Sequence, residues 1–134
     1  MDMKQFSTQH RVRIRRDGCG EEIILGRQFC ADMPKRTEYR AHVYEYGDSR
    51  LGVMLLFTSA RKWESAKRKL TAAGFTLRQD GHTEGTLLFD PANEAQARLA
   101  LAVIRAKRIR ELSPAHRATA TAVLAASRTL TKAA

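Results

Sequence analysis

The chain contains little cysteine, little proline and no long apolar run. Cys19 and Cys30 form no Cys-x-x-Cys pair and the four His show no His-x3-His spacing, which argues against a disulfide framework and a zinc site. The longest apolar run, Leu51–Phe57, is too short to span a membrane, and residues 1–16 hold no apolar signal segment. With 134 residues, we expect one soluble, cytoplasmic protein domain that needs no metal or cofactor to fold.

Acidic residues are also few, because 14 Asp and Glu stand against 24 Lys and Arg, for a net charge of +10. The excess lies at the two ends of the chain. Residues 1–16 carry five bases and one acid, and residues 98–134 carry eight bases and one acid. Seventeen of the 24 bases are Arg, whose planar donor fork suits phosphate. The charge favours a polyanionic partner, and the alternative is a soluble surface encoded by an Arg-rich genome.

Period-two and helical patterns predict an α+β domain with an antiparallel sheet of β-hairpins and helices packed on it. The expected order is ββββ-α-ββ-αα. The predicted strands are 11–15, 22–28, 41–46, 51–57, 75–79 and 85–89, and the predicted helices are 59–73, 90–111 and 113–128. We expect the strand at 51–57 to be central, because it is apolar on both faces.

Three segments of different character follow from these patterns. Residues 1–10 are expected to be a flexible lead, 11–112 the core domain, and 113–134 an Ala-rich helix. Residues 29–39 are predicted to form a loop of unusual length. The Ala-rich helix has few large apolar groups, so we expect a marginal or swapped element, which favours a homodimer.

The first strand carries the sharpest motif. Arg11, Arg13 and Arg15 alternate with apolar residues, so they are expected on one face at a spacing of about 6.8 Å. Such a row can track successive phosphates, or it can protect an edge strand against aggregation. A second basic run is expected at the end of the long helix, and its members are Arg105, Lys107, Arg108 and Arg110. Together these seven bases are the predicted nucleic-acid-binding residues.

Aromatic and acidic residues suggest two further readings. His42, Tyr44 and Tyr46 share one strand face, where aromatics can stack single-stranded bases, but we favour packing in the core or across strands. Carboxylates gather near two predicted turns and offer ligands for a divalent metal, although turns collect such residues anyway; they are Asp17, Glu21, Glu22, Glu45 and Asp48. No nucleophile elbow or phosphate loop accompanies them, so no catalytic or metal residue is assigned.

Residues 15–24, 44–46, 51–54 and 73–91 resemble segments of small bacterial proteins, many of them encoded on mobile elements. The similarity covers residues 11 to about 112. It implies no activity, cofactor or site residue, and it favours a bacterial or phage-borne accessory gene as the setting.

Three functions are consistent with these features of the sequence. The first is a non-enzymatic accessory protein that binds DNA or RNA through Arg-rich phosphate contacts. The alternative is a small protein-binding inhibitor or adaptor, such as a phage or mobile-element anti-CRISPR protein that binds a nucleoprotein effector. The third is a metal-dependent enzyme on nucleic acid that uses Glu21, Glu22 or Glu45. The first hypothesis requires the two basic ends to share one surface.

Overall fold

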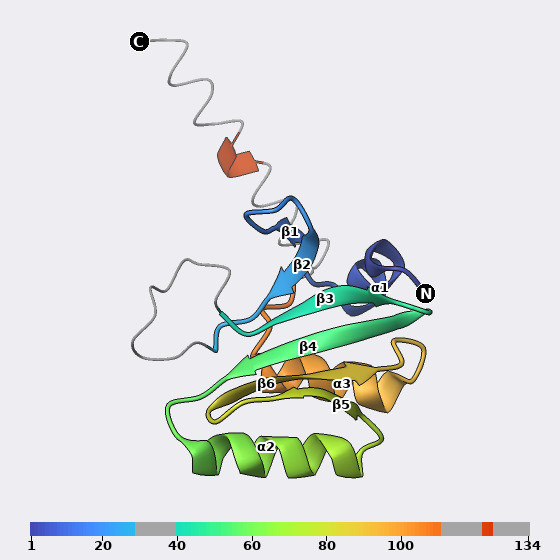
Figure 1. Cartoon of the computed structure of the whole chain (residues 1–134). Coiled ribbons are helices and arrows are strands. Elements are labelled where there is room, and N and C mark those ends of the chain that lie inside the picture. The colour runs from blue at the N-terminus through green and yellow to red at the C-terminus, as the bar shows by residue number, and fades with distance from the viewer. Residues whose placement is uncertain (29–39, 111–121, 125–134) are drawn as a thin grey trace.

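The computed structural model describes residues 1–28, 40–110 and 122–124 of the chain. These residues form an α+β fold in which one antiparallel sheet is packed against helices (Figure 1). In chain order the elements are α1 (Met3–His10), β1 (Arg15–Arg16), β2 (Glu22–Leu25), β3 (His42–Gly47), β4 (Arg50–Leu56), α2 (Ala60–Ala72), β5 (Thr76–Asp80), β6 (Glu84–Phe89) and α3 (Glu94–Val103). The predicted fold class is confirmed.

The sheet has the strand order β1-β2-β3-β4-β6-β5, and each neighbouring pair is antiparallel. Strand β4 lies between β3 and β6, as its two apolar faces predicted. The β3–β4 hairpin turns through Asp48 and Ser49, whose φ angles of 52° and 58° give the backbone twist that a two-residue hairpin loop requires.

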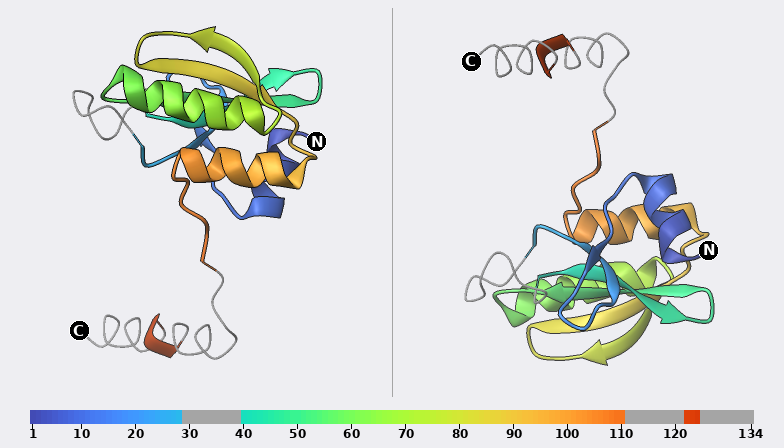
Figure 2. Two further views of the ribbon diagram at one scale, coloured as in Figure 1. Left: turned by 90° about the horizontal axis from the view of Figure 1, so that it is seen from below. Right: turned by 90° about the horizontal axis from the view of Figure 1, so that it is seen from above.

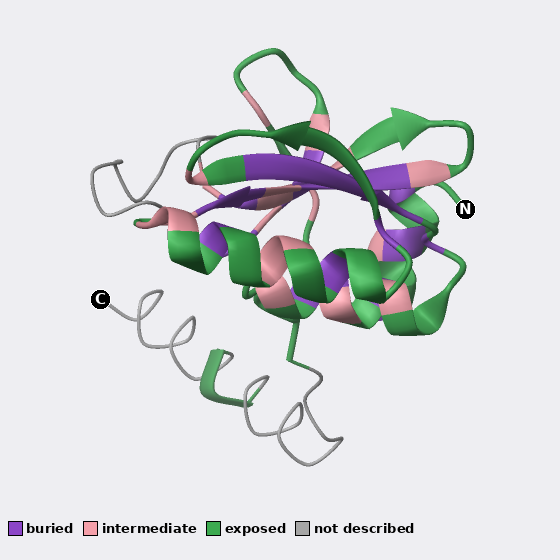
Figure 3. Cartoon of the chain, turned by 60° about the horizontal axis from the view of Figure 1, so that its bottom comes forward, coloured by how far each residue is buried: buried purple, intermediate pink, exposed green. Residues whose placement is uncertain are grey.

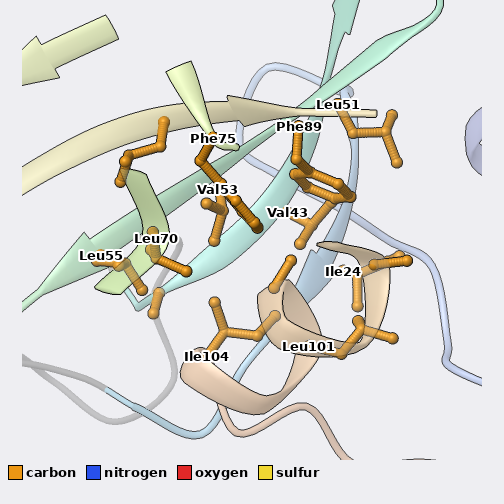
Figure 4. Packing of buried hydrophobic residues seen from close by; sticks show 14 of the residues in the cluster. Ile24, Val43, Leu51, Val53, Leu55, Leu70, Phe75, Phe89, Leu101 and Ile104 are labelled. Carbon is orange, nitrogen blue, oxygen red and sulfur yellow. The ribbon is translucent and has the colours of Figure 1, made fainter. Parts of the chain in front are cut away.

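The core lies on one face of the sheet. Alternate residues of the strands, among them Ile24, Val43 and Val53, point toward Leu70 of α2 and Leu101 of α3 (Figure 4). Met3 and Phe6 of α1 belong to the same cluster. Figure 2 shows α1, α2 and α3 on this side of the sheet. Helix α2 buries Trp63 and Leu70, and exposed stretches alternate with buried ones along it (Figure 3). We call this the helix face.

The opposite face carries a smaller apolar set. Ile23, Leu56 and Leu88 are 3% exposed, yet they do not belong to the core cluster. The register explains this, because each of them neighbours a core-facing residue along its strand and side chains alternate between faces. In the described part of the chain no helix packs on this side, which we call the open face.

The expected flexible lead is wrong for residues 3–10, which form α1. Asp2 and Gln5 make a reciprocal capping box, and Met3, Phe6 and His10 are buried. Their spacing of three and four residues is one helical stripe. Eight residues give a weak periodic signal, and it is the contact with the sheet that stabilises so short a helix.

The long helix was predicted too long at both ends. Residues 90–93 form a turn in which the Asp90 carbonyl accepts the Asn93 N–H at 3.0 Å, and Asn93 caps α3. After Val103 the helix ends, and Arg105 takes a φ of 58° that redirects the chain. Of the predicted final helix, residues 122–124 are helical and exposed, and its other residues lie outside the described ranges, as does the predicted loop at 29–39. Within the described ranges no helix is both long and apolar enough to cross a bilayer.

Candidate nucleic-acid interface

Described parts of the two basic segments, residues 11–12 and 108–109, lie side by side. Residues 106–110 run in extended conformation, and they make isolated bridges through Arg108 with Val12 and through Ala106 with Gly26. The Ile109 N–H also donates to the Arg11 carbonyl at 2.6 Å. The backbones of residues 11–12 and 108–109 are therefore adjacent, so the two basic segments meet, which the first hypothesis requires.

The segment after α3 is held tightly against the end of β2. The Gln28 N–H donates to the Ile104 carbonyl and the Arg27 N–H to the Arg105 carbonyl, both at 3.2 Å. A Cβ on Gly26 would overlap the Ile104 carbonyl, so glycine is needed for this close approach. The expectation that Arg105, Lys107, Arg108 and Arg110 end a helix is wrong, because these backbone bonds to β2 replace further helical turns.

Basic side chains line two adjoining hollows on this surface. The larger, of about 530 Å³, lies where β1, β2 and the segment 107–110 meet, and the smaller lies between α3 and Arg27. Arg27 and Arg108 line both. The nine bases that line the pair are Arg13, Arg15, Arg27, Arg40, Arg98, Arg105, Lys107, Arg108 and Arg110, and we call them the basic groove. No acidic residue of the described ranges lines either hollow.

Six of the seven predicted site residues belong to the basic groove. Arg13, Arg15, Lys107, Arg108 and Arg110 line the larger hollow, and Arg105 lines the smaller one. Arg11 lines neither, because it caps α1 in a left-handed conformation and does not continue the strand. The alternation of exposed arginines with Val12 and Ile14 holds, but only Arg15–Arg16 form a regular strand.

Sequence reasoning missed Arg27, Arg40 and Arg98 as members of the groove. They lie before the loop, after the loop and on α3, so only the fold brings them together. Summing charge by segment placed Arg27 and Arg40 in a nearly neutral region. Arg27 lies within the predicted strand 22–28, which placed it on the sheet but not beside the other bases.

The groove concentrates like charge. Burial and then the charge of Arg15 lower the pKa of the Arg40 guanidinium. Arg98 has a partner outside the groove, since its Nη2 lies 2.6 Å from Glu94 Oε1. A polyanion in the groove would offset this repulsion, which is the electrostatic condition for binding phosphates.

A separate hollow of about 360 Å³ lies on the open face, between the β1–β2 turn and strands β5 and β6. We call it the sheet hollow, and its lining residues are Asp17, Glu21, Glu22, Ile23, His42, Tyr44, Glu45, Met54, Gln79 and Thr86. Of the two packing modes favoured for the aromatic strand, in the core or across strands, the structure shows the second for Tyr44. Tyr44 packs across strands over Gly52, and Tyr46 is 39% exposed, with the Arg50 and Arg78 guanidiniums 5.7 and 5.9 Å from its ring.

Two of the acidic residues near the turns accept hydrogen bonds from backbone N–H groups. Asp17 Oδ1 accepts the N–H groups of Cys19 and Glu21, both at 2.9 Å, and Glu45 Oε1 accepts the Met3 N–H at 3.3 Å. Among the described residues, no three His, Cys, Asp or Glu side chains form a group that could hold a metal ion.

No protein-family model, curated protein or solved structure matches the chain. The function of this protein is therefore inferred from the arrangement of its own residues.

Proposed function

We propose that this protein is a non-enzymatic nucleic-acid-binding accessory protein whose basic groove contacts the phosphate backbone. The observation that carries the proposal is the meeting of nine bases in two adjoining hollows. They come from residues 13–15, from Arg27 and Arg40, from α3 and from the segment 105–110. A single small anion engages two or three such groups. A surface of this extent matches a polymer of phosphates, which releases counterions from each contact that it makes.

The composition of the groove supports backbone contacts. Eight of its nine bases are Arg, which binds phosphate through two parallel hydrogen bonds. Phosphate contacts position a protein on a nucleic acid without reading sequence, so we expect binding that depends weakly on base sequence and strongly on salt.

The test compares two triple variants that remove the same charge. One carries Arg13→Gln, Lys107→Gln and Arg110→Gln in the groove. The other carries Arg61→Gln, Arg68→Gln and Lys69→Gln on the exposed side of α2. Fluorescence anisotropy with labelled single- and double-stranded DNA and RNA gives the affinity at several salt concentrations.

We expect submicromolar binding by the parent near physiological ionic strength. The groove variant should lower the slope of log K against log salt by about 2 to 3, because each lost phosphate contact removes about 0.7–0.9. The α2 variant should keep the slope of the parent. Equal losses in both variants would mean that affinity depends on net charge alone, and no binding to any of the four polymers would favour a protein partner.

A further inference from the structure

We propose that the sheet hollow receives an unstacked base of a single-stranded nucleic acid whose phosphates lie along the basic groove. This inference rests on the proposed function and adds the form of nucleic acid that the protein binds. It concerns the sheet hollow, whose lining residues are not among those of the basic groove.

The hollow presents the ring of Tyr44 and the flexible apolar side chain of Met54 to a ligand. Tyr44 is half-buried and lies over Gly52, where any Cβ would overlap the ring. His42 contacts Tyr44 edge to face, with ring centroids 6.0 Å apart, and Met54 lies directly opposite His42 on β4. Aromatic side chains on a sheet surface bind splayed bases by stacking, and a paired duplex does not offer such bases.

A buried hydroxyl supports the same conclusion independently. Thr86 lines the hollow and is 8% exposed, and no described residue makes a hydrogen bond with its Oγ1. Buried polar groups in proteins are nearly always paired, so an unpaired one in a hollow indicates a missing partner. The edge of a nucleobase, with its donors and acceptors, is a partner that fits a hollow of about 360 Å³.

The hollow and the groove are continuous through β2. Arg15, which lines the groove, pairs with Ile23, which lines the hollow. Leu25 of the groove likewise pairs with His42 of the hollow. The His42 Nδ1 bonds the carbonyl of Arg40 at 2.7 Å, and because a carbonyl only accepts, Nδ1 carries the proton. Directly opposed strand residues lie about 5 Å apart, so one nucleotide spans the two sites.

The acidic residues of the hollow set the orientation of the strand. Asp17, Glu21 and Glu22 line the side formed by the β1–β2 turn, and Glu45 lies beside Tyr44 on β3. Carboxylates repel phosphates but accept hydrogen bonds from the amino groups of bases. The backbone is therefore excluded from the hollow and directed to the arginines, while the base enters.

Two variants on one strand test the assignment. Tyr44→Leu removes the ring but keeps apolar cover over Gly52, and Tyr46→Leu makes the same change on the same strand outside the hollow. We expect the parent to bind single strands at least tenfold more tightly than duplexes of equal length. Tyr44→Leu should weaken single-strand binding about five- to a hundredfold, the range of one base stacked on an aromatic ring. Duplex affinity and the affinities of Tyr46→Leu should stay within twofold.

Methyl NMR gives a second readout without mutation. On addition of a single-stranded oligonucleotide, the Met54 methyl resonance should shift and that of Met3, buried on the helix face, should not. Parallel titrations with DNA and RNA of one sequence identify which polymer is bound.

The outcomes separate this inference from the proposed function. If the groove variant changes the salt slope while Tyr44→Leu keeps the preference for single strands and Met54 does not shift, the base site is wrong and the phosphate surface stands. Equal losses in Tyr44→Leu and Tyr46→Leu would also overturn the assignment to the hollow. If the parent protein bound neither DNA nor RNA, both proposals would be wrong.

Discussion

His10 shows what burial does to a single titratable residue beside the groove. Its ring lies 4.6 Å from the ring of Phe6, and Nε2 makes no hydrogen bond with a described residue. Burial lowers the pKa of His10, the charges of Arg108 and Arg98 lower it further, and Glu94 opposes them. The folded protein therefore protonates this imidazole less readily than an unfolded chain does.

The protein should lose stability as the pH falls below about 6.5, because an unfolded His binds a proton there more readily than native His10 does. Urea unfolding between pH 7.5 and 5.5 measures the dependence. His10→Gln should make the free energy of unfolding less sensitive to pH, whereas His82→Gln, at an exposed turn, should keep the parent's dependence. The same pH dependence in the parent and His10→Gln would show that another group is responsible.

At the scale of elements, strands were easier to predict than helix ends. The second and third hairpins and α2 lie close to their predicted positions, because strand alternation and the Ser59 cap of α2 are local signals. The first predicted strand is wrong in its bounds, because only Arg15–Arg16 form β1. Helix α1 and the end of α3 were not predicted. The first is stabilised by the burial of Phe6 against Phe89, with ring centroids 5.9 Å apart, and the second by backbone bonds to residues 27 and 28. Both causes are distant in sequence.

Phe6→Ala should destabilise the protein by about 3–5 kcal/mol, because it leaves a cavity at a fully buried position between α1 and the sheet. Chemical unfolding monitored by circular dichroism gives the value. Lys4→Ala, exposed on the same helix, should change the free energy of unfolding by less than about 0.5 kcal/mol. A loss below about 1 kcal/mol for Phe6→Ala would mean that α1 is not part of the cooperative core.

The described part of the molecule consists of a sheet with helices on one face, an open second face and the basic groove. The nine bases of the groove lie close together and repel one another. None of them belongs to the hydrophobic core. Natural proteins retain residues that lower their stability where those residues bind a ligand. The arrangement therefore has a measurable consequence for stability in the absence of nucleic acid.

The groove variant with Arg13→Gln, Lys107→Gln and Arg110→Gln should be at least as stable as the parent at low salt, by a margin of up to about 1 kcal/mol. The difference should shrink in 0.5 M NaCl, where screening acts within about 4–5 Å. Urea unfolding at both salt concentrations tests this. A groove variant that is less stable than the parent in low salt would show that these bases hold the fold together.

The amino-acid sequence determined the fold class, the hairpins, the central strand and the location of the excess charge at the two ends, because periodicity, turn chemistry and charge are local properties. Only the tertiary structure decided that these ends meet: the bridge between Val12 and Arg108 joins residues 96 positions apart. It also recruited Arg27, Arg40 and Arg98, and left Tyr44 on the open face. The physical reason is that pairing register and helix termination depend on contacts between distant segments, which no local pattern encodes.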